Sequence, residues 1–73
     1  MAMDAAIIEK MIREGIPGAD VRIEDLRGDG DHYAAIVTSE SFVGKSRIAQ
    51  HRMVQDAVKH LQIHALSITT KIP

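Results

Sequence analysis

The sequence contains no cysteine. This absence excludes disulfides, a thiol nucleophile and any zinc or iron–sulfur site whose ligands are all cysteines of this chain. Because no disulfide calls for an oxidising compartment, we expect an intracellular protein that is located in the cytoplasm. A mitochondrial matrix form, from which a transit peptide has been removed, stays open beside it.

Aromatic residues are almost as scarce, since Tyr33 and Phe42 are the only two. A chain with two aromatic rings lacks the platform on which many single-strand binders stack successive bases. The formal net charge is −1, so the chain has no global positive field that would attract nucleic acid or anionic lipid. Any contact with nucleic acid must therefore rest on a local patch.

The chain also lacks long apolar runs. Its first four residues have neither the basic region nor the apolar stretch of a signal peptide, and the other apolar segments are too short to cross a bilayer. What is present is a 45% share of hydrophobic residues in a chain of 73, which is enough for one core. We therefore expect a single small domain over residues 1–73, of modest stability.

The first half of the chain predicts a helix and a β-hairpin. Asp4 is a suitable N-cap for the helix, and Gly15 ends it. The predicted buried face of this helix consists of Ile7, Ile8, Met11 and Ile12. Residues 20–27 alternate between apolar and charged side chains, which indicates a half-buried strand. The Gly-Asp-Gly-Asp sequence of residues 28–31 predicts a turn into a second strand over residues 32–39.

The second half predicts a loop, a helix and a third strand. Residues 41–46 form the loop, and Ser46 N-caps a helix that runs to Leu61. The apolar stripe of this helix consists of Ala49, Met53, Val54, Ala57, Val58 and Leu61. Residues 65–70 alternate and are rich in β-branched side chains, so they predict the third strand.

The predicted order of elements is therefore α-β-β-α-β. A right-handed β-α-β crossover makes the second and third strands parallel if they share a sheet. The economical arrangement is an α+β fold, in which one three-stranded mixed sheet carries both helices on one face.

Three motifs resemble the BolA-like protein family. FVGKS at residues 42–46, followed by QHRMV at residues 50–54, is similar to the central signature of that family. IHALSI at residues 63–68 resembles its closing strand, which begins with a hallmark histidine. The hairpin tip GDGDHY at residues 28–33 resembles the short-loop, YrbA-like branch. The resemblance implies a fold related to class II KH domains.

The resemblance also implies a function. Family members are described as non-enzymatic partners of monothiol glutaredoxins in [2Fe-2S] cluster binding, transfer or iron regulation, and some as transcriptional regulators. It implies a heterodimer that shares the cluster with a glutaredoxin and glutathione, while the isolated chain binds no cluster and is a monomer or a weak homodimer. Family members commonly continue with a short Trp- and Arg-containing helix, which these 73 residues do not include.

Two histidines are the candidate metal ligands. The resemblance assigns the hallmark histidine to His64 and a variable His-or-Cys ligand to His32. Two imidazoles can replace two thiolates on one iron of a [2Fe-2S] cluster, as in Rieske centres. The predicted topology agrees, because His32 and His64 begin adjacent parallel strands, which start at the same edge of the sheet. With no thiol in this chain, a glutaredoxin cysteine and glutathione must supply the other ligands.

The remaining histidines and carboxylates have ordinary interpretations. His51 is expected to pack at the start of the second helix, and His60 to be solvated near its end. Asp29, Asp31 and Glu40 lack a companion nucleophile, so we reject a catalytic acid–base pair and predict no enzyme. The sequence Gly-Lys-Ser at residues 44–46 lacks the upstream glycine of a phosphate-binding loop.

A basic cluster supports the competing interpretation, a DNA-binding transcriptional regulator. Lys45, Arg47 and Arg52 surround a helix start, whose free N–H groups favour anions. Gly44 is the only glycine of this loop, whereas a KH domain grips nucleic acid with a Gly-x-x-Gly loop. The same surface, which includes His51, also suits an acidic partner protein or the carboxylates of glutathione. A metal-free interaction module is the third possibility.

Overall fold

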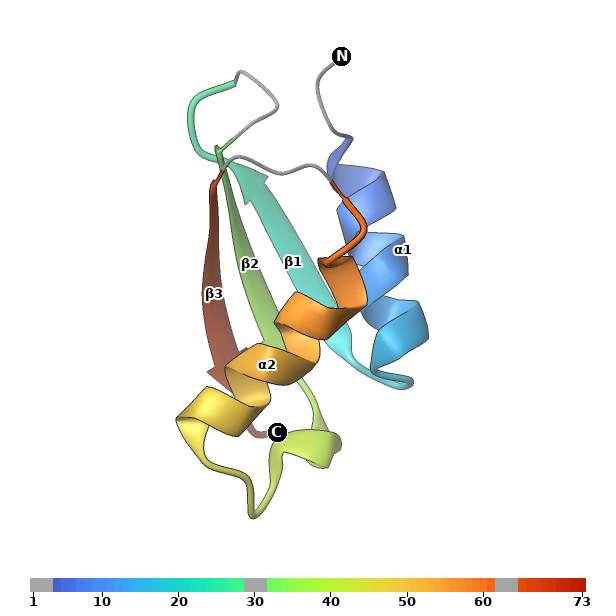
Figure 1. The fold of residues 1–73 in the computed structure, drawn as a ribbon, viewed down its shortest axis with the longest axis vertical. Coiled ribbons are helices and arrows are strands. Elements are labelled where there is room, and N and C mark those ends of the chain that lie inside the picture. Colours follow the sequence, from blue (N-terminus) through green and yellow to red (C-terminus); the bar gives the residue numbers. More distant parts are fainter. Residues whose placement is uncertain (1–3, 29–31, 62–64) are drawn as a thin grey trace.

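The computed structural model describes residues 4–28, 32–61 and 65–73. The elements are α1 (Ala5–Gly15), β1 (Asp20–Asp25), β2 (His32–Thr38), the 3₁₀ turn η1 (Glu40–Phe42), α2 (Arg47–Val58) and β3 (Ala65–Lys71). Figure 1 shows this order along the chain. The predicted α-β-β-α-β order is confirmed, and η1 is an additional short turn inside the predicted loop.

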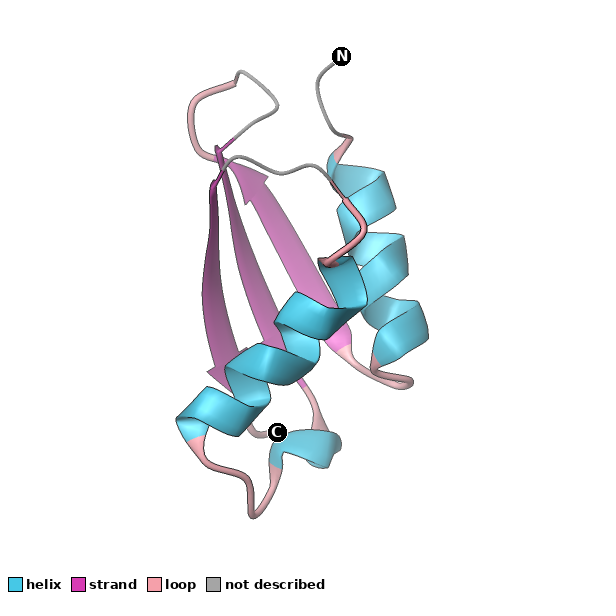
Figure 2. Cartoon of the chain, viewed as in Figure 1, coloured by secondary structure: helices cyan, strands magenta, loops and turns pink. Residues whose placement is uncertain are grey.

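The three strands form one mixed sheet in the order β1-β2-β3. β1 and β2 are antiparallel, whereas β2 and β3 are parallel. The chain passes through α2 between β2 and β3, which is the crossover that parallel neighbours require. Figure 2 shows α1 and α2 on the same face of the sheet. The predicted α+β architecture is therefore confirmed, and the described helices leave the other face of the sheet uncovered.

The core lies between the sheet and the two helices. β2 alternates strictly between half-exposed and buried side chains, because successive residues of a strand point to opposite faces. Its buried residues, Tyr33, Ala35 and Val37, face the helices. Phe42 of η1 is fully buried in the same apolar cluster.

α1 begins at the residue that the sequence indicates. The Asp4 side chain accepts a hydrogen bond of 2.9 Å from the Ala6 N–H and so caps the helix. Ile8 and Ile12 are fully buried, as predicted. The prediction for Ile7 is wrong, since its side chain is 46% exposed. Successive helical residues are about 100° apart, and Ile7 lies on the solvent side of the face that Ile8 and Ile12 bury.

Gly15 is the last residue of α1, but for a different reason from the predicted one. The glycines with positive φ are Gly18, Gly28 and Gly44, so Gly15 is not a left-handed helix terminator. A Cβ atom built on Gly15 would lie 2.7 Å from the Cβ of Ala57 in α2. The missing side chain therefore lets α1 and α2 approach closely.

β2 ends one residue earlier than the sequence indicates, β1 two residues earlier and α2 three residues earlier. β1 ends at Asp25, because Asp25 Oδ1 accepts hydrogen bonds from the N–H groups of Arg27 (3.3 Å) and Gly28 (2.9 Å) and turns the chain. α2 ends at Val58 rather than Leu61, since the Leu61 N–H donates to the Val58 carbonyl at 2.9 Å in a tighter turn.

Within the described ranges, no helix combines the length and the apolar character that crossing a membrane requires.

Candidate functional site

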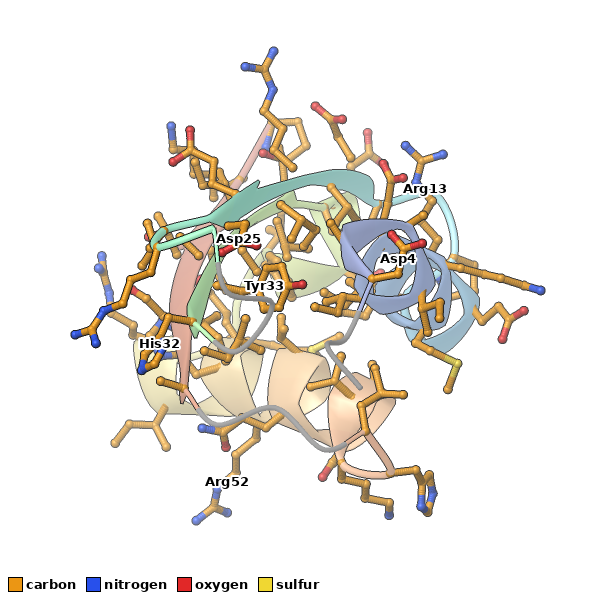
Figure 3. All side chains as sticks on the ribbon, turned by 90° about the horizontal axis from the view of Figure 1, so that it is seen from above. Asp4, Arg13, Asp25, His32, Tyr33 and Arg52 are labelled. Carbon is orange, nitrogen blue, oxygen red and sulfur yellow. The ribbon has the colours of Figure 1, made fainter. Side chains whose placement is uncertain are left out.

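His32 is the first residue of β2 and lies at one end of the sheet. Its backbone carbonyl accepts a hydrogen bond of 2.8 Å from the Leu26 N–H, which extends the pairing of β1 with β2. Tyr33 is buried towards the helices, so strand alternation directs the His32 side chain to the opposite face. Figure 3 shows the His32 ring at the margin of the molecule and Tyr33 inside it. The half-exposed imidazole is accessible to a partner.

The start of β3 lies directly beside His32. In the parallel pair of β2 and β3, the register partner of His32 is Ala65. This pair confirms the prediction that β2 and β3 start at the same end of the sheet. His64, which precedes Ala65 in the chain, lies outside the described residues, so its ligand role stays a prediction.

The turn before His32 is anchored at its β1 end. The Asp25 carboxylate holds the N–H groups of Arg27 and Gly28, and Gly28 has a φ of 69°, which favours glycine. The other predicted turn residues, 29–31, lie outside the described residues. Asp25 and Gly28 therefore fix the direction in which the chain leaves β1 at the histidine end of the sheet.

The predicted basic surface surrounds the start of α2. Lys45, Arg47 and Arg52 are exposed, and Figure 3 shows Arg52 pointing away from the ribbon. Gly44 has a φ of 78° and turns the chain towards Ser46, whose hydroxyl accepts the hydrogen bond that caps α2. Lys45 and Arg47 thus stand at a helix N-terminus, an arrangement that favours negatively charged groups, and Arg52 adds a positive charge in the second turn of α2.

A residue that the sequence patterns did not single out holds this loop in place. Gln50 is buried, and its amide nitrogen donates to the carbonyls of Phe42 (3.2 Å) and Lys45 (3.0 Å). Its amide oxygen accepts a hydrogen bond of 2.5 Å from the Thr70 hydroxyl of β3. The sequence signal for a buried Gln50 is its position four residues before Val54, which is also buried. Residues four apart lie on the same helix face.

The histidine end and the basic surface lie at opposite ends of the sheet. β2 and β3 start at His32 and Ala65, whereas α2 starts near their other end, where Gln50 contacts Thr70 (Figure 1). A strand of seven residues, such as β2, spans about 20 Å. A small ligand bound at His32 therefore does not reach the basic surface, and only a macromolecule contacts both.

The other histidines of the described chain lie away from His32, and His51 directly precedes Arg52 of the basic surface in α2. His51 is half-exposed within α2, and His60 is exposed beyond the end of that helix. Among the residues that the structure describes, no three His, Cys, Asp or Glu side chains are grouped so that they could hold a metal ion. The described part of the chain thus offers an imidazole at His32, not a complete metal site.

Comparisons with known proteins agree with this fold. The Rickettsia prowazekii protein RP812, which is described as a BolA-like hypothetical protein, is 37% identical over 73 residues. The match covers 96% of this chain and 95% of the relative. The NMR structure of RP812 superposes with a TM-score of 0.79 at 36% identity, and the match covers 100% of this chain and 99% of that one.

Two further solved structures are similar over nearly the whole chain. A BolA protein homologue from Coxiella burnetii has a TM-score of 0.81 and 32% identity, covering 97% of this chain and 92% of its own. Yeast Fra2 has a TM-score of 0.82 and 30% identity, covering 99% of this chain and 82% of its own. The family model described as BolA-like protein matches residues 13–73. The chain therefore belongs to the BolA-like protein family.

Proposed function

We propose that this protein is a non-enzymatic partner of a monothiol glutaredoxin and shares a [2Fe-2S] cluster with it. His32 and His64 are the proposed ligands from this chain. The observation that carries the proposal is the register of β2 and β3, in which His32 is paired with Ala65, the residue directly after His64. Consecutive Cα atoms are about 3.8 Å apart, so His64 is one residue along the chain from the position that is paired with His32.

The donor set of the chain supports a shared cluster. The chain has no cysteine, and the described residues contain no complete metal site. Two imidazoles suit one iron of a [2Fe-2S] cluster, but the second iron then needs thiolates from elsewhere. A glutaredoxin cysteine and a glutathione thiol are the proposed source. The half-exposed position of His32 at the margin of the molecule suits a ligand that completes a partner's site.

The test is a titration of a cluster-loaded monothiol glutaredoxin with this protein. We expect a heterodimer in light scattering and a changed visible circular dichroism spectrum, because imidazole replaces thiolate on one iron. A glutaredoxin that has lost its cluster is the control, and it should not give the new spectrum. If the loaded glutaredoxin keeps its own mass and spectrum, the proposed function is wrong.

A second candidate function is DNA binding by the basic surface. The observation that favours it is the exposure of Lys45, Arg47 and Arg52 around the capped start of α2. About three phosphate contacts give weak binding, with a slope of log K against log salt of about −2.7. A gel-shift series at increasing salt tests this function, and the absence of any shift at low salt removes it.

A further inference from the structure

We infer that β3 pairs edge to edge with β3 of a second copy of this chain, antiparallel and with Ile68 on the two-fold axis. The pairing joins two three-stranded sheets into one continuous sheet. β3 is the last strand of the order β1-β2-β3, and Figure 1 shows its outer edge along the margin of the fold. The residues whose backbone groups form this edge are not among those assigned to the proposed cluster and DNA functions.

Three residues of β3 direct their backbone polar groups to this outer edge. The Lys71 carbonyl accepts a hydrogen bond from the Ser39 N–H at 3.1 Å, so the backbone of Lys71 points towards β2. Backbone direction alternates along a strand, and the N–H and C=O groups of alternate residues therefore point outwards. These residues are Leu66, Ile68 and Thr70. No described element of the chain pairs with this edge.

The composition of β3 leaves the edge open to pairing. Its sequence, ALSITTK, has no proline and no charge before Lys71, the last residue. β1, at the opposite edge, is DVRIED and carries four charged residues in six. Charged side chains and prolines are the devices that prevent edge strands from pairing with other chains. The two edges differ in this respect, and β3 is the unprotected one.

An apolar groove runs beside the same edge. It has a volume of about 310 Å³ and is lined by Gln55 and Val58 of α2, by Lys59 and Leu61 beyond that helix, and by Leu66 and Ile68 of β3. Leu66 and Ile68 are only half-buried on the helix side of the sheet. A strand added at this edge places every second side chain against the groove, as in recognition by β-strand addition.

The edge is complementary to itself in one antiparallel register. With Ile68 opposite Ile68 of the second copy, Leu66 lies opposite Thr70, and each of these pairs exchanges two backbone hydrogen bonds. The apolar side chains of each copy then cover the groove of the other. The two Lys71 side chains lie at opposite ends of the seam, whereas parallel pairing would put these like charges side by side. The charge pattern therefore selects the antiparallel arrangement.

The register gives a matched pair of variants. Ser67 and Thr69 are exposed on the open face of the sheet, so their substitution leaves the core unchanged. In the inferred dimer, Ser67 lies opposite Thr69 of the second copy. The double variant S67K/T69K then opposes like charges twice across the seam, while S67K/T69E opposes unlike charges. The two variants differ only at position 69.

Sedimentation velocity measures the result. From about 10 µM to about 1 mM, we expect the wild type to show a concentration-dependent dimer. S67K/T69K should raise the dissociation constant by about tenfold, and S67K/T69E should lower it, with far-ultraviolet circular dichroism confirming that both are folded. A wild type that stays monomeric at the highest concentration, or equal dissociation constants for the two variants, overturns the inference.

Cross-linking tests the register directly, because the natural chain has no cysteine. Ser67 and Thr69 of the second copy form a non-hydrogen-bonded pair with Cα atoms about 4.5 Å apart, within disulfide range, whereas two Ser67 residues are about 7–8 Å apart. A mixture of S67C and T69C proteins should therefore oxidise to a dimer faster than either protein alone. Equal rates for the mixture and the single variants contradict the register.

Discussion

His32 and Ala65 are register partners across the parallel pair of β2 and β3, although the whole of α2 separates them in the chain. This pairing puts the start of β3 beside the hairpin histidine, at one end of the sheet. The right-handed crossover through α2 is what creates the pairing, since parallel strands start at the same edge. The proposed half of a cluster site follows from this topology.

The close approach of α1 and α2 at Gly15 predicts an unusual response to alanine. Gly→Ala within a helix normally stabilises by about 1 kcal/mol. Here the new Cβ would meet the Cβ of Ala57 at 2.7 Å, so we expect Gly15→Ala to lower the free energy of unfolding by about 1–3 kcal/mol. Urea denaturation measures the change. The double variant Gly15→Ala/Ala57→Gly should recover part of the loss, and strictly additive effects would contradict the contact.

The hydrogen bond between Thr70 and Gln50 predicts a stability difference between two neighbouring threonines. Thr70→Val removes the hydroxyl that donates to Gln50 and leaves the buried amide oxygen without this partner. We expect a loss of about 1–3 kcal/mol in the free energy of unfolding. Thr69→Val, on the exposed face of the same strand, is the control and should change stability by about 0.5 kcal/mol at most. Equal effects of the two substitutions in urea denaturation would show that the bond contributes little.

The separation of the histidine end from the basic surface predicts that their functions can be removed independently. Replacing Lys45, Arg47 and Arg52 by glutamine should abolish DNA binding, because the three charges that would contact phosphates are lost. Each lost contact also reduces the slope of log K against log salt by about 0.9. The same triple variant should still change the spectrum of a cluster-loaded glutaredoxin. If the triple variant forms no cluster complex, the basic surface also contacts that partner.

Histidine ligation predicts a direction of pH dependence. Only the neutral imidazole binds iron, so protons compete with the metal for each ligand. The cluster-containing heterodimer should therefore be less stable at about pH 5.5 than at about pH 7.5. The amplitude of the visible circular dichroism at increasing dilution measures this stability. An equally stable complex at both values would be inconsistent with histidine ligands.

Much of the fold is predictable from local chemistry. Asp4 and Ser46 indicate the helix starts because their side chains accept hydrogen bonds from the first turn, as the structure confirms. The parallel pairing of β2 and β3 follows from element order and the handedness of the crossover. The end of α2 at Val58 is not predictable in this way, since the apolar stripe continues to Leu61, which still packs against the core after the helix has ended.

The candidate site is less predictable than the fold. Glutamine is seldom buried, so the sequence gives no reason to assign a role to Gln50, and that role depends on carbonyls that only the folded loop brings together. The distance between His32 and the basic surface depends on the sheet and is not visible in the sequence. The ligand role of His64 depends on the family resemblance, since a histidine before a strand is by itself an ordinary residue.

Three histidine variants, each in complex with a cluster-loaded monothiol glutaredoxin, test whether His64 and His32 are cluster ligands. We predict that His64→Ala abolishes the changed visible circular dichroism spectrum and that His32→Ala weakens it. His60→Ala, at an exposed position beyond α2, is the matched control and should leave the spectrum unchanged. A wild-type spectrum from the His64→Ala complex would remove His64 from the ligand set.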